Sequence, residues 1–534
     1  MKKTVITILM AFIAISGYSQ TAYSAMMLSE NDYEGTARTA AMGNAFTALG
    51  GDLGAVSINP AATAVTKYSQ VTITPGLSII SSTASGVSPF EDGSLPYFEK
   101  TMKSNRTRFN LPNAGFSINF NTGRKTGVKS FSAAFVVNKT ATYNQNVYAS
   151  GTNSTTSFMG QMAYEASVNG YPSSALGAEN AFDTMPWKSV IGYKTGMIDP
   201  YGDIYVAGTE KVYDDKTAFM AGTVNQAYGR NISGSKYDYL LNFGMNISDF
   251  IYLGLNLGLN SATYYYSEYF TEQAVDPNEF EISYVDNNGN PIPNLTKYFD
   301  RMKYKSSYSY SGLGVFAKFG VIVTPIAGLR IGAAIQTPTA MEVNETWEES
   351  GEARFSGGGQ YSSESPYGEN DWSFRSPLIA NFGVAYTFKK LGLVSVDYEL
   401  CDYGNLKYTN SSYTDRSVLE EINEEMKNSY GVAHKLRVGA EIKPIPALAL
   451  RAGYNLNVSG EKAIWDGFEY AKINPTISHK AALGIGFSSK KSFFADLACT
   501  RSFIPNEYFM PYSDYVYKYS KGEYIVDPNY YAPE

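Results

Sequence analysis

Acidic and basic residues stand at alternate positions in several segments of this chain. Asp397 and Glu399 are two residues apart, Arg437 and Glu441 are four apart, and Arg451 lies in the next segment of the same kind. Residues separated by an even number of positions share one face of a β-strand. Opposite charges that face each other on adjacent strands form ion pairs with hydrogen bonds. We therefore predict a charge network on the inner face of a sheet, consisting of Asp397, Glu399, Arg437, Glu441, Arg451 and Arg330, with Lys318 and Asp496 pointing inward elsewhere.

The motifs of the common enzyme classes are missing. The sequence has no Gly-x-Ser-x-Gly elbow, no P-loop and no cluster with metal-ligand spacing. Its only histidines, His434 and His479, begin alternating segments and are expected at a membrane interface. Residues 285–294 lack the glycine that a calcium loop has at its sixth position, which favours a hairpin turn. We expect no catalytic residue, no metal and no cofactor.

A long segment between residues 149 and 234 carries large apolar side chains at helical spacing. Methionine adapts to apolar partners of varied shape, so this pattern is typical of a groove for an oily ligand. The alternative is that these residues only pack the segment against itself, and the sequence leaves both open. The predicted groove residues are Phe158, Met159, Met162, Phe182, Met185 and Trp187, with Ala163 and Ala166 on the same helix face.

A second amphipathic helix is predicted between residues 404 and 433. Asp415 stands where it would cap the helix, and Val418, Ile422 and Met426 recur every four residues against a glutamate-rich face. This pattern favours a structural lid over a ligand site.

The elements that position these residues are strands, because apolar residues alternate with polar ones along most of the chain. Thirteen segments have this period of two. They are 71–79, 109–120, 131–137, 235–247, 251–269, 307–323, 329–336, 378–388, 393–403, 434–443, 448–455, 479–488 and 492–502.

The connections between these segments alternate between short and long. Short ones lie at 121–127, 246–249, 324–328, 389–392, 443–447 and 488–492; long ones lie at 83–106, 149–234, 271–306, 338–376, 404–433 and 456–478. Tight turns on one side and long loops on the other are typical of an outer-membrane β-barrel. A soluble sandwich is the alternative, but it rarely combines such long strands with one-sided loops. The tyrosines at 264–266, 308 and 310 are expected in the interface girdle of the barrel.

Composition agrees with one large closed architecture. The 534 residues include 14% aromatics, of which 44 residues are tyrosine, and no linker or shift in composition divides the chain. The net charge of −7 and the lack of basic runs argue against a nucleic-acid partner. Cys401 is predicted to point inward and Cys499 outward, so both should be free thiols.

The N-terminus reads as a secretory signal. Two lysines precede an apolar run, and small residues at 17 and 19 predict cleavage after Ser19. No cysteine follows the site, so no lipid anchor is expected there. The predicted organisation is a signal peptide (1–19), an N-terminal hatch (20–68) and a barrel (69–534).

Thirteen strands would leave an open edge in lipid, where backbone groups go unsatisfied. A fourteenth strand should therefore follow Phe503. Either residues 511–526 form an irregular last strand, or the chain lacks its natural C-terminus, and we favour the second.

The hatch is predicted to consist of short helices built from small residues. One runs over 36–49 and ends at Gly50 and Gly51, and Asp52 caps a turn through Val56. A further short helix is predicted over Ala61–Ala64. Asn59 would be its N-cap, and Pro60 would be at the N1 position. Helices with so little bulk would fit inside a tube.

The sequence GTARTAAMGNAFTALGGDLGAVSINPA, followed by an alternating barrel, resembles the FadL/OmpP1/TodX family of outer-membrane transporters for hydrophobic compounds. Weaker similarities continue in GLRIGAAIQTP, NFGVAYTF, VSVDYELCDYG, KLRVGAEIKP and LALRAGY, so the resemblance spans about 31–503. It implies an all-β, transmembrane antiparallel barrel of about 14 strands with a helical hatch inside. Asn59, Pro60 and Ala61 match the hatch motif, with Gly50 and Gly51 before it, and 129–148 would be the third strand.

The resemblance also implies a function. An apolar ligand would be caught by the outer loops, pass to a site beside the hatch, and leave through a gap in the wall near the third strand. The expected protein is a monomer in the outer membrane of a Gram-negative bacterium that takes up long-chain fatty acids or similar compounds by passive diffusion. Its expected partners are hydrophobic small molecules, lipids and lipopolysaccharide. The alternative is a barrel that serves as scaffold or shuttle in a protein secretion system.

Two roles remain open for the inner charges. We expect them to brace the wall and to hold the hatch through Arg38. The alternative is that Arg330, Arg437 or Arg451 binds the carboxylate of a ligand.

Overall fold

The structure is a computed structural model. It describes residues 22–85, 101–214, 217–282, 296–412, 414–465, 470–489, 492–506, 512, 517–520 and 523–526. The predicted signal peptide (1–19) and the predicted hairpin turn at 285–294 lie outside the described residues.

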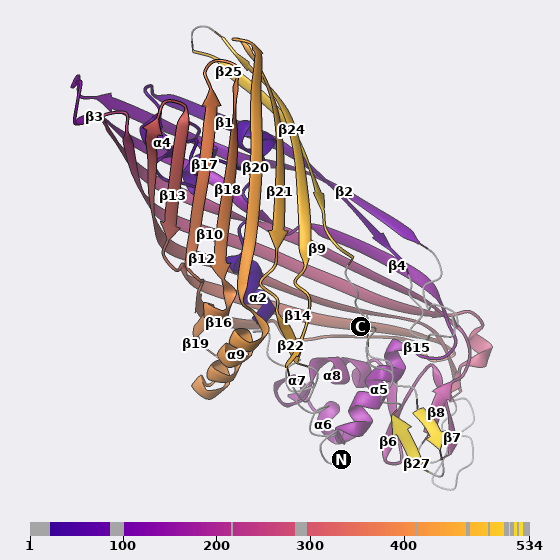
Figure 1. Cartoon of the computed structure of the whole chain (residues 1–534). Helices are drawn as coiled ribbons and strands as arrows, with labels where there is room; N and C mark the ends of the chain where they lie inside the picture. The colour runs from indigo at the N-terminus through magenta and orange to yellow at the C-terminus, as the bar shows by residue number, and fades with distance from the viewer. Residues whose placement is uncertain are drawn as a thin grey trace.

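One large antiparallel sheet forms the wall of the molecule, and consecutive wall strands are neighbours. Each of the thirteen predicted segments lies in one of these strands (Figure 1). They are β1 (Gln70–Ala84), β2 (Met102–Asn121), β3 (Val128–Thr142), β9 (Val224–Ile247), β10 (Ile251–Ala274), β12 (Lys297–Ile326), β13 (Leu329–Gln336), β17 (Ile379–Phe388), β18 (Gly392–Asp402), β20 (Val432–Ile445), β21 (Leu448–Val458), β24 (Ile477–Ser488) and β25 (Phe494–Phe503). The short connections also lie where the sequence predicts them.

The wall is longer than predicted on the side of the long connections. Residues 338–376 were expected to form a loop, but they form β14 (Ala340–Ser356), β15 (Gly359–Glu364) and β16 (Gly368–Arg375). Further extensions are β4 (Gln145–Asn153), β11 (Glu281–Ile282) and β19 (Lys407–Ser411). The outward side chains of these strands are mostly polar, so no apolar alternation reveals them. Smaller hairpins are β5 (Ile198–Tyr201) with β6 (Ile204–Ala207), β7 (Glu210–Asp214) with β8 (Thr217–Met220), and β22 (Ala463–Trp465) with β23 (Tyr470–Lys472).

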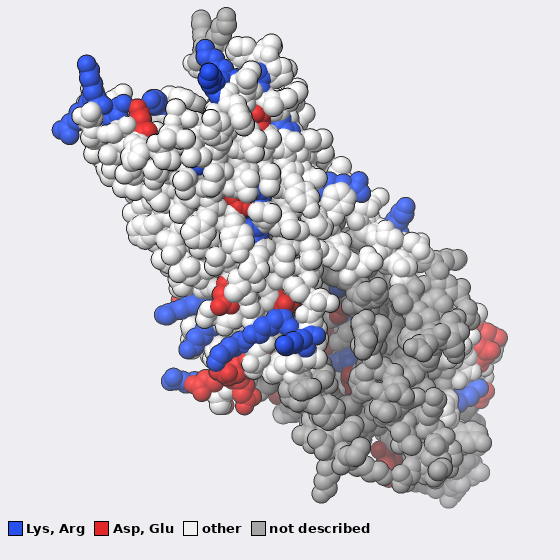
Figure 2. Space-filling model, viewed as in Figure 1, with Lys and Arg blue, Asp and Glu red and all other residues white. Residues whose placement is uncertain are grey.

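An aliphatic belt covers the outer surface of the wall. Leu257 on β10, Phe319 on β12 and Leu483 on β24 are each at least half exposed. Their strand neighbours Asn256 and Lys318 point the other way and are buried. Figure 2 shows a broad band of uncharged residues between the charged ends of this face. Apolar side chains outside and polar ones inside are the reverse of a soluble protein and are typical of a membrane barrel.

No helix of the described chain is both long and apolar enough to cross a bilayer.

The wall encloses the N-terminal segment. Helix α3 (Ala37–Ala41) packs against β21, β24 and β25, whereas α4 (Ala62–Val65) packs against β3, β9 and β10. Helix α2 (Ala22–Ser29) and the 3-10 helix η1 (Gly54–Ser57) complete the hatch. Because strands from both ends of the sheet touch the hatch, the sheet curls around it, as Figure 1 shows. The fold is therefore all-β, a barrel with its N-terminal segment in the lumen.

Glycines on the inner face of the wall make room for the hatch. A Cβ atom on Gly332 would overlap the backbone of Thr47, and one on Gly453 would overlap the backbone of Gly43. The same holds for glycines on other strands. The inward glycines whose Cβ would collide with hatch backbone atoms include Gly254, Gly332, Gly439 and Gly453. The hatch thus touches the wall backbone directly, which larger residues would prevent.

The hatch is less helical than predicted. A helix over 36–49 was expected, but α3 ends at Ala41. The reason is that Gly43 and Asn44 both adopt positive φ angles, of 60° and 58°, which a right-handed helix excludes. Thr36 is the N-cap of α3, and its side chain accepts a hydrogen bond from the amide of Thr39. Helix α2 has no counterpart in the sequence prediction.

Two expectations concern the end of the chain and the cysteines. Residues 517–520 and 523–526 pair with each other as β26 (Tyr517–Ser520) and β27 (Glu523–Val526), so in the described part they add no strand to the wall. This result goes against the irregular last strand proposed for 511–526. Cys401 is buried, Cys499 is exposed, and both are free, as predicted.

Candidate functional site

Wall side chains hold the hatch by its backbone carbonyls. Lys318 Nζ donates to Ser57 O across 2.7 Å, Arg330 Nη1 to Leu49 O across 2.5 Å, and Lys435 Nζ to Asn31 O across 2.5 Å. Short irregular helices leave such carbonyls without partners of their own. The wall cations satisfy them, so hatch and wall form one hydrogen-bonded unit.

The predicted hatch motif is a junction between hatch segments and wall. Asn59 Nδ2 donates to Thr47 O across 2.6 Å and to Val321 O of β12 across 3.2 Å, while its Oδ1 accepts from the amide of Ala61. Pro60 O accepts from Asn242 of β9. Helix α4 begins at Ala62, one residue later than predicted. Gly50 and Gly51 adopt positive φ angles at the turn that precedes η1.

Most of the predicted inner charges meet and form two clusters, whereas Arg330 and Lys318 join neither and donate to hatch carbonyls instead. Arg437 Nη2 lies 2.7 Å from Glu399 Oε2, and Arg451 Nε lies 2.6 Å from Glu441 Oε2. Arg451 Nη1 also lies 2.5 Å from Asp496 Oδ1. All of these residues except Asp496 are buried.

The hatch joins both parts of this network. Arg38 Nε approaches Glu441 Oε2 at 3.4 Å, and Asp397 accepts from the amide of Thr47. Arg330, Arg437 and Arg451 each have a protein partner in the structure. The geometry therefore supports a bracing role, and carboxylate binding by these arginines remains a prediction.

A buried apolar cluster, with α2 packed in its middle, lies between the rest of the hatch and the outer end of the barrel. We call it the aromatic chamber. Trp372 lies 6.0 Å from Tyr310 and 5.1 Å from Tyr408, measured between ring centroids, and all three are buried. The remaining buried wall residues of the chamber are Ala262, Tyr264, Met341, Val343, Phe374, Ile379, Cys401, Tyr403, Leu406 and Ala433.

Helix α2 fills the aromatic chamber. Ala25, Met26 and Leu28 are buried among its aromatic side chains. Two tyrosine hydroxyls contact the same helix: Tyr310 lies 3.1 Å from Ser24 Oγ, and Tyr143 donates to Met27 O across 3.4 Å. The chamber is therefore occupied by a short separate segment of the chain. Sequence analysis missed α2, although its apolar run AYSAMMLS could have indicated a buried helix.

The chamber corrects one expectation about tyrosine. Tyr264 and Tyr310 were predicted in the interface girdle, but each is only 5% exposed and points inward. Their neighbour Tyr265 is 41% exposed on the outer surface and fits the girdle. Consecutive tyrosines on a strand must face opposite sides, so a run of three cannot all belong to the girdle.

Helix α9 (Arg416–Ser429) covers the outer end of the chamber. Leu419 and Met426 are buried in the chamber cluster, and Ile422 packs against it. Val418, predicted on this face, is only partly buried. Asp415 is at the N-cap position, but its side chain makes no capping hydrogen bond. The helix has the position expected of a lid.

The predicted loop-groove residues come together at the outer end of β9, β10 and β12. Helix α5 (Phe158–Val168) buries Phe158, Met159 and Met162. Its neighbours are α6 (Ser173–Leu176), α7 (Ala181–Thr184) and α8 (Trp187–Lys194). Phe182, Met185 and Trp187 are partly exposed. We call this the outer loop cluster; a ligand groove within it stays a prediction, because the α5 side chains are already packed.

Glu272 fixes α5 to the barrel. This buried carboxylate accepts from the amide of Phe158 across 2.7 Å and from Gln226 Nε2 across 2.7 Å. The N-terminus of a helix favours a negative charge, and burial opposes it. Burial is the larger effect and raises the pKa of Glu272 to about 7. Outward residues of β10 change from leucine to serine, threonine and tyrosine beyond Ser261, so Glu272 lies outside the membrane-spanning part of the strand.

The wall is interrupted beside the chamber. Pairing between β2 and β3 stops at Asn113 and Asn138, and β3 ends at Thr142. A cavity of about 500 Å³ lies at this break, and residues of both faces of the wall line it, among them the exposed Phe109, Asn144 and the buried chamber residues Tyr264 and Tyr310.

Two consecutive residues of the break lie beside the chamber and the cavity. The ring of Tyr143 packs edge-on against the chamber residue Tyr264 at 5.6 Å, and Asn144 lines the cavity. The interruption needs Gly234 on β9, whose φ is 148° and whose carbonyl accepts from the amide of Tyr143. A Cβ at this position would overlap the carbonyl oxygen of Thr263. We call residues 143–144 the wall break.

Within the described residues, no group of three or more His, Cys, Asp or Glu side chains is arranged to hold a metal ion.

Comparison with known proteins gives structural similarities only. No protein-family model matches the chain, and no curated protein sequence matches it. The chain is similar to the crystal structure of a Pseudomonas aeruginosa FadL homologue, with 12% identity, 89% of this chain and 90% of that chain covered, and a TM-score of 0.45. It is also similar to the Pseudomonas putida toluene transporter TodX, with 10% identity, 89% and 97% coverage, and a TM-score of 0.39.

Proposed function

We propose that this protein is an outer-membrane transporter that takes up hydrophobic compounds by passive diffusion through the hatch-filled barrel. The observation that carries this proposal is the aromatic chamber, whose interior is occupied by α2 and not by side chains of the wall alone. A polar solute would gain nothing in such a chamber, whereas an apolar molecule buries its surface there.

The location follows from the wall. The aliphatic belt, the inward polar residues and the long connections at one end together suit an outer membrane, with the long connections outside. The proposed protein acts as a monomer, with the lipids and lipopolysaccharide of that membrane around the belt.

Entry would take place at the outer end. The outer loop cluster and the lid helix α9 are both apolar on their inner sides and stand above the chamber. Partly exposed aromatic and methionine side chains such as Phe182, Met185 and Trp187 offer a first contact for an oily molecule.

Binding would replace α2. The helix spans only eight residues, so it has little stability of its own outside the chamber. Its buried Met26 and Leu28 occupy the volume that an alkyl chain or an aromatic ring would need. Long-chain fatty acids and similar compounds fit this description.

Exit would take place through the wall break. The cavity that Asn144 lines also reaches the chamber residues Tyr264 and Tyr310, and Tyr143 packs against Tyr264 beside it. A ligand that passes here reaches the bilayer side without crossing the hatch. The contacts of α3, η1 and α4 with the wall would then remain intact during transport, and only α2 would move.

The test uses N-phenyl-1-naphthylamine, a neutral apolar fluorophore, as the probe. Trp372→Ala together with Tyr408→Ala should slow its uptake by cells on the order of tenfold, because each ring contributes about 0.5–1.5 kcal/mol beyond its buried area. Binding to the purified protein should weaken in parallel.

The matched control is Tyr398→Ala, which removes a tyrosine from the outer surface of β18. It should leave uptake unchanged. Equal uptake by the chamber variant and the wild type, in cells where both proteins fold, would rule the proposal out. Stable co-purification of a secretion protein would instead favour a scaffold role.

A further inference from the structure

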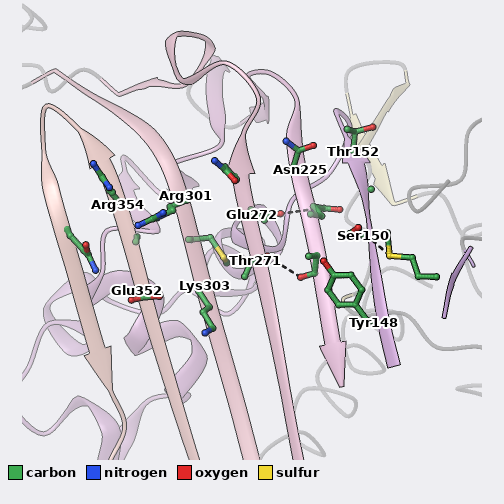
Figure 3. A pocket seen from close by; sticks show the side chains of 18 residues that line it. Tyr148, Ser150, Thr152, Asn225, Thr271, Glu272, Arg301, Lys303, Glu352 and Arg354 are labelled. Atoms are coloured by element: carbon green, nitrogen blue, oxygen red, sulfur yellow. Dashed lines mark hydrogen bonds between the residues drawn. The ribbon is translucent and has the colours of Figure 1, made fainter. Parts of the chain in front are cut away.

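A second cavity lies on the outer surface of the wall, on the opposite face from the outer loop cluster. It encloses about 670 Å³ where β4, β9, β10, β12 and β14 extend beyond the aliphatic belt (Figure 3). We call it the outer groove. Its lining includes Tyr148, Asn225, Thr271, Arg301, Lys303 and Arg354.

The outer groove faces away from the lumen. Arg301, Lys303 and Arg354 are exposed, whereas their strand neighbours Met302 and Ala353 are buried in the outer loop cluster. A ligand in the groove would therefore contact the outside of the barrel only.

Three basic side chains, Arg301, Lys303 and Arg354, line the groove, and Glu352 lies opposite Lys303 on the neighbouring strand. Arg354 pairs with Asp300 at 3.3 Å but keeps about half of its side chain exposed, and Lys303 Nζ lies 5.7 Å from the ring of Tyr269. Across the described part of the chain, neither Arg301 nor Lys303 forms an ion pair with a carboxylate. Two glutamates line the groove. Glu352 faces it, whereas Glu272 faces the other side of the wall, where it accepts a hydrogen bond from Gln226 (Figure 3). Exposed guanidinium and ammonium groups with spare donors suit phosphate oxygens.

The other lining residues suit a sugar. Thr271 and Asn225 offer hydroxyl and amide groups that donate and accept. Tyr148 is 39% exposed and presents an aromatic face on which the C–H face of a pyranose can pack. Donors, acceptors, one aromatic face and several cations together match a phosphorylated saccharide better than a lipid tail.

The height of the groove points to the same ligand. The outermost aliphatic residue on the outward face of β12 is Leu313. Lys303 lies ten residues from it along the strand, toward the outer end. At about 3.4 Å per residue and a strand tilt of about 40°, Lys303 lies roughly 25 Å beyond the belt. Acyl chains end at the belt, so only the outward saccharide of a glycolipid reaches this level.

We propose that the outer groove binds the phosphorylated core saccharide of the glycolipid in the surrounding outer leaflet. This inference depends on the proposed outer-membrane location and adds a site that the transport path does not use. Bound saccharide would anchor the extended strands β12 and β14 in the glycolipid layer.

The test is calorimetric titration of the detergent-purified full chain with deacylated, phosphorylated core oligosaccharide from lipopolysaccharide. Arg301→Gln together with Lys303→Gln should weaken binding by about tenfold or more, because charge-assisted contacts to phosphate are lost. The charge-conserving pair Arg301→Lys and Lys303→Arg should retain most of the affinity. Enzymatically dephosphorylated oligosaccharide should bind the wild type at least about tenfold more weakly.

The matched control is Arg124→Gln with Lys125→Gln, which removes the same charge from the short turn at the opposite end of the barrel. It should bind like the wild type. An equal loss in both neutralised variants, equal binding of the dephosphorylated sugar, or no binding by the wild type would each overturn the inference. Should the double variant fail to fold, Lys303→Gln alone and the dephosphorylated sugar still decide the question. Uptake of N-phenyl-1-naphthylamine should be unchanged in the groove variant, so failure of transport is detected separately.

Discussion

The backbone amide of Thr47 in the hatch donates a hydrogen bond to Oδ2 of Asp397 on β18 across 2.6 Å. Both residues are buried. Asp397 lies on β18 directly opposite Arg437 of β20, and its carboxylate reaches the hatch from the wall. A hydrogen bond to a charged acceptor contributes about 1.5–3 kcal/mol. This contact therefore holds the middle of the hatch to the wall more strongly than a neutral hydrogen bond would.

We expect Asp397→Ala to loosen the hatch locally without unfolding the barrel. Hydrogen exchange of the amides at residues 44–49 should become on the order of tenfold faster, which is the equivalent of about 1.4 kcal/mol. Ser395→Ala, two residues earlier on the same face, is the control, since the buried Ser395 hydroxyl has no hydrogen-bond partner in the described structure. Exchange that stays at the wild-type rate in the Asp397 variant would show that other contacts suffice.

The inward glycines predict a second way to disturb the hatch. Gly453→Leu places a side chain where the backbone of Met42 and Gly43 lies, so the hatch must move. Ala452→Leu, one residue earlier, points to the outer surface and should have no effect. Single-channel recording should show ion leakage for Gly453→Leu only. A silent bilayer with both variants would mean that the hatch adapts to the added bulk.

Sequence reasoning located the wall because a membrane barrel repeats one simple pattern. Leu253, Leu257 and Leu259 had to face lipid, and the period of two then fixed which side Asn256 and Lys318 occupy. The inner charges followed from the same alternation. Positions in a regular strand can be counted, so Glu399 and Arg437 are expected on the inner face of adjacent strands, and the structure shows that they form an ion pair.

The aromatic chamber could not be predicted in this way. Its residues come from α2, α9 and strands that are distant in the sequence, and no local period connects Met26 with Trp372. The backbone of the hatch could not be predicted either, because the left-handed turn at Asn44 is held by a contact with another segment of the hatch. Asn44 Nδ2 donates to Tyr33 O across 2.6 Å, a contact that no sequence pattern indicates.

The docking of α5 should depend on pH through Glu272. Burial raises the pKa of this carboxyl to about 7, above the ordinary value of about 4.3. A raised pKa means that the docked state binds the proton more tightly. Docking is therefore most stable below about pH 4.3 and loses stability as pH rises through about 7.

Glu272→Gln should remove this dependence, because the amide is neutral at every pH and its oxygen still accepts from Phe158. The measurement is hydrogen exchange of residues 158–168 between pH 5 and pH 8, corrected for the intrinsic rate. Glu279→Gln, at an exposed carboxylate of the 3-10 helix η2 (Pro277–Glu279), is the control and should keep the wild-type slope. An unchanged slope in Glu272→Gln would assign the pH effect to another group.

Binding in the chamber and release through the wall break can be separated by blocking the break from outside. Asn144 lines the cavity of about 500 Å³, and the neighbouring Tyr143 faces the chamber. Asn144→Trp should fill much of the cavity while leaving every residue of the chamber in place.

We expect the purified variant to bind N-phenyl-1-naphthylamine like the wild type. Cells that carry it should take up the probe at least about fivefold more slowly, because passage needs the space that the indole fills. Ile118→Trp adds the same ring to the outer face of β2, nine residues from the cavity residue Phe109, and should transport normally. If Asn144→Trp transports at the wild-type rate, the ligand leaves the barrel by another route, and the break serves only to accommodate the turn of the chain between β3 and β4.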